Sequence, residues 1–238
     1  TLLVALESRD LFGDKYEKIL KRCVEKSLYE YASDAYEAPF EYIGTDGKPK
    51  PEGEGRLIDP GHTMEAMWFS MKAGIKCGNT EYGKRAMRVL DWVIQRCYDE
   101  EYGGFYQHVD LDGMLEERFL VNSYAGIPAA WNDKIWWVQA EGLYALGMSA
   151  LFHENEKHFR YFMKMYDYVQ NNFRDKEYGE WYSILKRDGR MVSDYKGFEL
   201  KGPYHVPRCL MQLVTLLEEY LEQKGKANDR HSKEGGKG

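Results

Sequence analysis

The sequence predicts an all-α domain built from repeated helical units, with a short β-hairpin in the connection between successive units. One observation is a spacing that occurs three times: a Tyr stands ten positions before an Asp-Gly pair, and a second aromatic residue follows that Tyr by three or four positions. The copies occupy residues 36–47, 102–113 and 178–189. The other observation is that apolar residues recur at helical spacing between the copies. Repetition of this kind is typical of helical arrays.

The individual elements follow from local patterns. In residues 14–32, Leu20, Val24 and Leu28 recur every four positions and share one helical face. Asp-Gly pairs favour tight turns and aromatic flanks favour strands, so each copy of the spacing predicts a hairpin. Because the hairpins fall on equivalent connections of a stack or ring, we expect them at one rim, with a site where the next helices begin. The same apolar pattern predicts further helices at residues 62–76, 81–98, 134–152, 156–173 and 205–222.

Length and composition limit the possible partners. A chain of 238 residues with 43% hydrophobic content is one large domain, or much of one. The net charge is −6 and no basic patch is visible, which argues against a nucleic-acid or anionic-membrane partner. No apolar run approaches the ~20 residues of a membrane span. Four scattered cysteines without CxxC spacing favour neither zinc nor a disulfide framework, and indicate a reducing, cytoplasmic location.

The first candidate site is the helix start that follows the first hairpin. It reads Asp-Pro-Gly-His-Thr-Met-Glu and ends at Glu65. His62 and Glu65 are three positions apart and share one helical face. A carboxylate so placed can orient an imidazole or hold it cationic, as acid–base catalysis requires. A histidine bonded to a nearby carboxylate for purely structural reasons is the alternative.

The second candidate follows the second hairpin and combines aromatic with polar side chains. Sugars present apolar C–H faces to aromatic rings and hydroxyl groups to amides and carboxylates, so this combination suits a carbohydrate site. Adjacent tryptophans cannot both face one cavity, so we expect one of the pair to lie in the core. The residues concerned are Lys134, Trp136, Trp137, Gln139 and Glu141.

The third candidate is the helix start after the third hairpin, where His205 and Arg208 are again three positions apart. An arginine there can bind a hydroxyl group or a developing oxyanion, or can pair with an acidic neighbour. Two histidine-centred helix starts at equivalent places in a repeat support a shared site more strongly than either does alone.

These motifs together resemble the N-acylglucosamine 2-epimerase family, in the family's order and approximate spacing. The resemblance covers the chain from near Thr1 to about Gln223. The His-Val-Pro-Arg-Cys sequence is closer to the N-acetylglucosamine branch, whereas Trp-Trp-Val-Gln-Ala-Glu is more similar to the cellobiose 2-epimerases. The motifs that carry it are Gly55-Arg-Leu-Ile-Asp-Pro-Gly-His62-x-x-Glu65, Lys134-x-Trp136-Trp137-x-x-x-Glu141 and Lys201-x-x-Tyr-His205-Val-Pro-Arg208-Cys.

The resemblance implies an (α/α)6 toroid, a ring of twelve helices in six pairs. Residues 1–223 would then be the C-terminal portion of one such domain, a partial ring of about seven helices with the hairpins on one rim. The missing helices would be N-terminal, and a half ring would expose apolar helix faces that a closed ring buries. Residues 224–238 are polar and Gly-rich, and we expect a disordered tail there.

The activity that the resemblance implies is interconversion of N-acetylglucosamine and N-acetylmannosamine. His62 and His205 would remove and return the C2 proton, with Glu65 orienting His62. Arg208 and Lys134 would stabilise the charge on O1, and Trp136, Trp137, Gln139 and Glu141 would hold the sugar. No metal or cofactor is required; a nucleotide such as ATP is a possible activator, and a homodimer is the common assembly in the family.

Three alternatives remain open from the sequence. An aldose–ketose isomerase, or a cellobiose or mannose 2-epimerase, would use the same fold and the same first proton abstraction. A glycoside hydrolase would need a pair of carboxylates across the scissile bond, for which Glu65 and Glu141 are the candidates. The chain could also be a non-catalytic binding protein or an inactive fragment.

Overall fold

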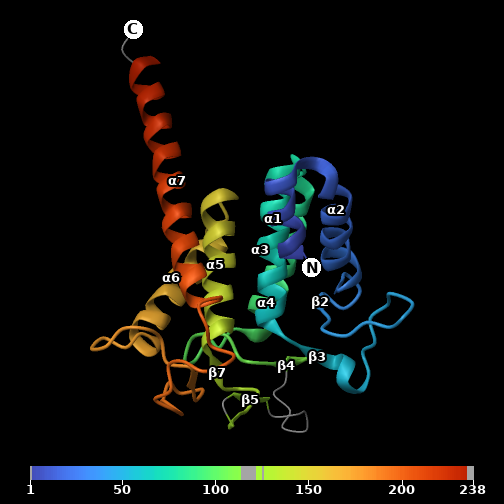
Figure 1. Ribbon diagram of the computed structural model, residues 1–238, viewed down its shortest axis with the longest axis vertical. Helices are drawn as coiled ribbons and strands as arrows, with labels where there is room; N and C mark the ends of the chain where they lie inside the picture. The colour runs from blue at the N-terminus through green and yellow to red at the C-terminus, as the bar shows by residue number, and fades with distance from the viewer. Residues whose placement is uncertain (1, 114–121, 125, 235–238) are drawn as a thin grey trace.

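The computed structural model describes residues 2–113, 122–124 and 126–234, and α-helices dominate this part of the chain (Figure 1). This confirms the predicted all-α class. A 3-10 turn, Gly13–Tyr16, joins the first two helices, and π-helical turns at Lys26–Glu30 and Val169–Phe173 extend α2 and α6. The helices are α1 (Leu2–Phe12), α2 (Glu17–Glu25), α3 (Pro60–Cys77), α4 (Thr80–Cys97), α5 (Trp136–Phe152), α6 (Glu156–Tyr168) and α7 (Val206–Glu234).

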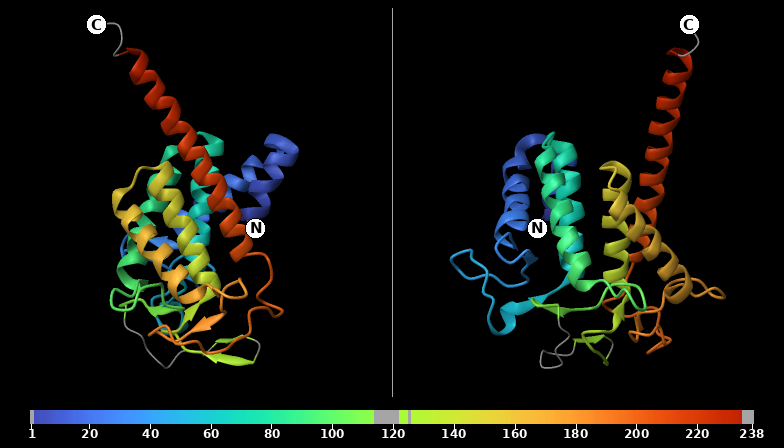
Figure 2. Two further views of the ribbon diagram at one scale, coloured as in Figure 1. Left: turned by 90° about the vertical axis from the view of Figure 1, so that its left-hand side faces the viewer. Right: turned by 180° about the vertical axis from the view of Figure 1, so that it is seen from behind.

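The helices form two layers. Helices α1, α3, α5 and α7 pack side by side in that order, and α2, α4 and α6 each pack against the helix that precedes them (Figures 1 and 2). Residues 136–151 of α5 are all buried, as expected for a helix of the inner layer that has neighbours on every side. Helices α4 and α6 bury only one face and cover the outside. The arrangement is the predicted partial ring of helical pairs.

The strands are short and all lie at one end of the helices, as Figures 1 and 2 show. This confirms the prediction that the connections gather at one rim. Each strand pairs with a single antiparallel partner. The pairs are β1 (Ala32–Ser33) with β2 (Ala38–Pro39), β3 (Leu57–Ile58) with β4 (Val109–Asp110), β5 (Asn122–Tyr124) with β6 (Ile127–Ala129), and β7 (Lys134–Ile135) with β8 (Ile184–Leu185).

The predicted turns are confirmed, and the flanks of the first and third turns pair across them through the bridges Ile43–Pro49 and Leu185–Met191, whereas the flank that follows the second turn lies outside the described residues. Gly47, Gly113 and Gly189 each close a turn by donating their N–H to the carbonyl three residues earlier, and each has a positive φ. The strand before the second turn, β4, pairs with β3, and the strand before the third, β8, pairs with β7. Because β3 leads into α3 and β7 leads into α5, each unit fixes the start of the preceding inner helix. An isolated two-stranded hairpin has only marginal stability, and pairing between strands of successive units stabilises the rim.

Two helices differ from the prediction. Helix α1 was not expected, because its apolar residues surround the helix: Leu6 is buried while Val4 and Leu11 are exposed. Helix α7 runs to Glu234, beyond the predicted end at residue 222. The disorder expected for residues 224–238 stays a prediction, and residues 235–238 lie outside the described residues.

Apolar side chains are exposed along one face of α7. They recur at helical spacing, and α7 is the last inner helix of the arc (Figure 1). An incomplete ring leaves such a face uncovered, as the sequence predicts. No helix among the described residues has the length and apolar character that crossing a membrane requires. The exposed residues on α7 are Leu210, Met211, Val214, Leu217 and Leu221.

Candidate active site

His62 and His205 line the same pocket, which has a volume of about 380 Å³ and lies where α3, α5 and α7 begin. This is the rim position that the repeat predicts. Asp59 caps α3 by accepting a hydrogen bond from the N–H of His62, with Pro60 as the first helical residue, so local chemistry fixes where His62 stands. The other lining residues are Asp59, Glu65, Tyr124, Trp136, Trp137, Leu200 and Tyr204.

Trp137 lies between the two histidines. Its ring centroid is 5.0 Å from that of His62 and 5.4 Å from that of His205. The indole can come this close to α3 because residue 61 is Gly: a β-carbon there would lie 2.2 Å from the Trp137 ring. Trp136 is almost fully buried and makes edge contacts with Tyr124 and Phe198. Both tryptophans nevertheless line the pocket, so the expectation that only one of them faces the cavity stays a prediction.

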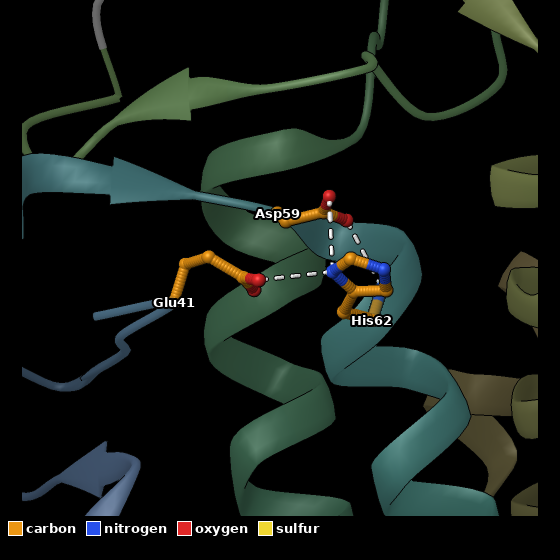
Figure 3. Close-up of side chains that lie close together, drawn as sticks. All are labelled: Glu41, Asp59 and His62. Carbon is orange, nitrogen blue, oxygen red and sulfur yellow. Dashed lines mark hydrogen bonds and ion pairs between the residues drawn. The ribbon is translucent and has the colours of Figure 1, made fainter. Parts of the chain in front are cut away.

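Two carboxylates hold the ring of His62 through the same nitrogen. Nδ1 lies 3.1 Å from Oε1 of Glu41 and 3.3 Å from Oδ2 of Asp59 (Figure 3). The hydrogen bond with Glu41 is the main cause that raises the pKa of His62 to about 9, against the opposing effect of burial. Burial raises the pKa of the Asp59 carboxyl to about 7. His62 is therefore an imidazolium at neutral pH.

His205 is held through the equivalent nitrogen. Its Nδ1 lies 2.6 Å from Oε1 of Glu141, a buried carboxylate on α5. Glu141 also accepts a hydrogen bond of 2.7 Å from Nε1 of Trp68 and forms an ion pair with Arg208. With Nδ1 of both histidines occupied by a carboxylate, Nε2 is the nitrogen that remains for a substrate proton.

The predicted partnership of Glu65 with His62 is not formed. Glu65 instead accepts a hydrogen bond of 2.9 Å from the hydroxyl of Tyr204 and lies 3.3 Å from Nη1 of Arg208. The guanidinium of Arg208 stacks 4.0 Å from the centroid of the Tyr204 ring. Glu65 extends from α3 toward α7, whereas the ring of His62 turns back toward the first hairpin. The three-residue spacing places both on one side of the helix but does not decide which neighbours they meet.

Lys134 and Gln139 are in the core rather than in the pocket. Lys134 is 0% exposed, with Nζ 3.1 Å from Asp99 and 3.3 Å from the carbonyl of Gly104, and burial lowers its pKa to about 8. The amide of Gln139 bonds both the N–H and the carbonyl of Phe105 at 2.8 Å. Both side chains fasten the start of α5 to the second hairpin. The structure thus contradicts the expectation that they hold the sugar or stabilise O1.

Glu41, Asp59 and Tyr204 belong to the site and were not predicted as site residues. Asp59 and Tyr204 stand inside the motifs that surround His62 and His205, so the N-cap position and the neighbouring aromatic were available signals. Glu41 is 21 positions before His62, and no spacing in the sequence connects the two.

Two sets of three residues in the described part of the chain bring potential metal ligands within 4.8 Å of one another. One is Glu41, Asp59 and His62; the other is Glu65, Glu141 and His205. In each set a histidine nitrogen already meets a carboxylate oxygen. These contacts are what acid–base imidazoles use for orientation, and the expectation that no metal is required stays a prediction.

Comparison with known proteins identifies the family. A family model described as N-acylglucosamine 2-epimerase (GlcNAc 2-epimerase) matches residues 3–209. The chain belongs to the N-acylglucosamine 2-epimerase family. The rat (Rattus norvegicus) N-acylglucosamine 2-epimerase is 29% identical over 222 residues, which are 93% of this chain and 50% of the rat protein. The chain spans about half the length of the curated relatives that it matches.

Solved structures of two other sugar-converting enzymes show the same architecture. A D-mannose isomerase superposes with a TM-score of 0.74 at 18% identity, over 90% of this chain and 54% of that one. A cellobiose 2-epimerase from Bacillus thermoamylovorans gives 0.71 at 16% identity, over 90% and 51%. These neighbours are (α/α)6 toroids, so the predicted fold class is confirmed.

Proposed function

We propose that the protein containing this chain is a sugar 2-epimerase that interconverts N-acetylglucosamine and N-acetylmannosamine. The observation that supports this most is the pair of carboxylate-bound histidines facing one pocket with Trp137 between them. Inverting C2 of an open-chain sugar requires one group that removes the proton beside the carbonyl and another that returns it on the opposite face. His62 and His205 are the two groups in the pocket suited to both steps.

In the proposed mechanism the two histidines begin in different protonation states. Epimerisation in one direction needs one histidine as a neutral base and the other as a protonated acid, and the reverse reaction exchanges these two roles. His62, whose pKa is raised to about 9, is the resting acid, and His205 removes the C2 proton through Nε2. The Trp137 ring offers a flat apolar surface to the C–H face of the sugar. Arg208, which stacks on Tyr204 beside His205, is the hydrogen-bond donor toward the O1 oxygen of the enolate.

Proton NMR of N-acetylglucosamine in D2O tests the proposal. We expect loss of the C2 proton signal and growth of N-acetylmannosamine signals with the wild-type protein. His62→Ala and His205→Ala should abolish both, whereas His153→Ala, at the opposite end of α5, should leave both intact. Normal exchange in the two single variants would show that the histidines are not the acid–base pair.

An aldose–ketose isomerase is the second candidate, because a D-mannose isomerase shares this fold. It would return the proton to C1, and the same NMR experiment with mannose in place of N-acetylglucosamine would then show a ketose. The hydrolase alternative fits less well. An oxygen of Glu65 lies within 4.8 Å of one of Glu141, and both carboxylates bind Arg208, whereas glycosidase pairs are about 5 Å or more apart with the substrate between them. Nucleotide activation and a homodimer stay predictions.

A further inference from the structure

The first hairpin supplies the site with a carboxylate that none of the three motifs contains. We propose that Glu41 is a positioning residue, which fixes the His62 ring through Nδ1 and keeps it protonated so that Nε2 serves as the acid. The acid role of His62 in this inference rests on the proposed function, whereas its positioning by Glu41 rests on geometry alone. Glu41 acts through His62 and does not itself touch the reacting atoms.

The contact geometry directs the ring. Oε1 of Glu41 and Oδ2 of Asp59 approach the same ring nitrogen, at 3.1 and 3.3 Å, and the other ring nitrogen points away from both (Figure 3). A proton on Nδ1 is shared with these two oxygens, so Nε2 is left for the pocket. The carboxylate is well anchored, because the preceding residue, Phe40, is buried and donates its N–H to the carbonyl of Tyr31 at 2.7 Å.

Glu41, rather than Asp59, is the main counter-ion of His62. Asp59 is 5% exposed, and because burial raises its pKa to about 7 it is partly protonated at neutral pH. One of its oxygens is also engaged in capping α3. The side chain of Glu41 is 28% exposed, and its Oε1 lies 3.1 Å from Nδ1 of His62, closer than Oδ2 of Asp59 at 3.3 Å.

The other titratable groups around His62 do not replace this role. Glu65, one turn further along α3, attracts the imidazolium only at longer range. His108, on the second hairpin, lies 3.6 Å from Asp59, and burial lowers its pKa to about 4, so it is neutral. Tyr204 and His205 face His62 across the pocket from the start of α7. Removal of Glu41 therefore takes away the carboxylate that lies nearest to Nδ1 of His62.

The test combines a titration with an activity profile, using Glu41→Gln, Glu41→Asp and the control Glu52→Gln, an exposed glutamate in the same connection. The His62 ring resonance is assigned from its absence in His62→Gln and followed by NMR from pH 5 to 10. We expect Glu41→Gln to lower the His62 pKa by about one unit or more. Glu41→Asp should recover part of this shift, and Glu52→Gln should behave as wild type.

The rate of C2 proton exchange gives the second readout. The acid must be protonated, so the wild-type rate should fall as the pH rises through about 9, and Glu41→Gln should move this fall to lower pH by the same shift. An unchanged His62 pKa in Glu41→Gln would overturn the inference. If wild type shows no exchange but Glu41→Gln still lowers the pKa, the positioning by Glu41 stands and the proposed function fails.

Discussion

Replacement of the buried carboxylate Glu141 is the strongest perturbation that the site offers. Glu141 is 1% exposed and has three partners: Trp68 at 2.7 Å, His205 at 2.6 Å, and Arg208 in an ion pair. Glu141→Gln keeps the shape but removes the charge and replaces an acceptor oxygen by an NH2 donor. All three partners donate hydrogen bonds to it, so at least one is left facing another donor.

The expected loss can be estimated from these contacts. Removing one partner of a buried ion pair costs about 3–5 kcal/mol of unfolding free energy. Arg208 keeps Glu65, its side chain is 15% exposed, and the glutamine still accepts through its remaining oxygen, so a loss of about 2–3 kcal/mol is expected. With a urea m-value of about 2–3 kcal/mol/M, the unfolding midpoint should fall by about 1 M.

Urea unfolding followed by circular dichroism and tryptophan fluorescence measures this loss. The matched control is Glu100→Gln, which breaks an exposed pair with Lys164 and should change the free energy of unfolding by less than about 0.5 kcal/mol. If the two variants had the same midpoint, the reasoning that Glu141 carries a buried charge shared by three donors would be refuted.

Three further predictions concern the same rim. Gly61→Ala should displace Trp137 and lower stability by about 1–3 kcal/mol, seen as a lower urea midpoint and a changed Trp fluorescence spectrum; an unchanged spectrum would contradict the close packing. Lys134→Met should lower the urea midpoint because Asp99 loses its buried partner, yet leave KM for the sugar unchanged; a raised KM would restore Lys134 as a sugar ligand. His62 has a folded-state pKa raised to about 9, so its contribution to stability is complete below about 6.5 and is lost as the pH rises through 9; midpoints for His62→Gln should lack that decline.

The helix starts were predictable because their chemistry is local. Asp, Pro and Gly in succession mark an N-cap and first turn wherever they occur, and α3 begins within two residues of the predicted position. The turn glycines were equally predictable, since only Gly adopts a positive φ without strain there. The pairing of β4 with β3 was not, because it depends on how one unit packs against the next.

The partners of the site residues depend on packing between units and so could not be read from spacing. Glu41 reaches His62 across 21 positions, and Glu141 reaches His205 across 64. Lys134 shows a second limit. A lysine near tryptophans suits a sugar site in any sequence, and the same lysine suits a buried ion pair with Asp99; only the packed structure separates the two.

The two histidines differ in how much negative charge reaches them, and this difference gives the pocket a direction. His62 faces Glu41 and Asp59, whose carboxylates favour its protonated form. Glu141, the carboxylate that binds His205, also pairs with Arg208, whose positive charge offsets that of Glu141. A sugar bound over Trp137 therefore meets an imidazolium on one side and, on the other, a histidine whose carboxylate is shared with an arginine. Arg208→Met should remove this difference and slow C2 proton exchange at neutral pH. Proton NMR in D2O measures the exchange rate, and an unchanged rate in Arg208→Met would show that Arg208 does not contribute to the asymmetry of the pocket.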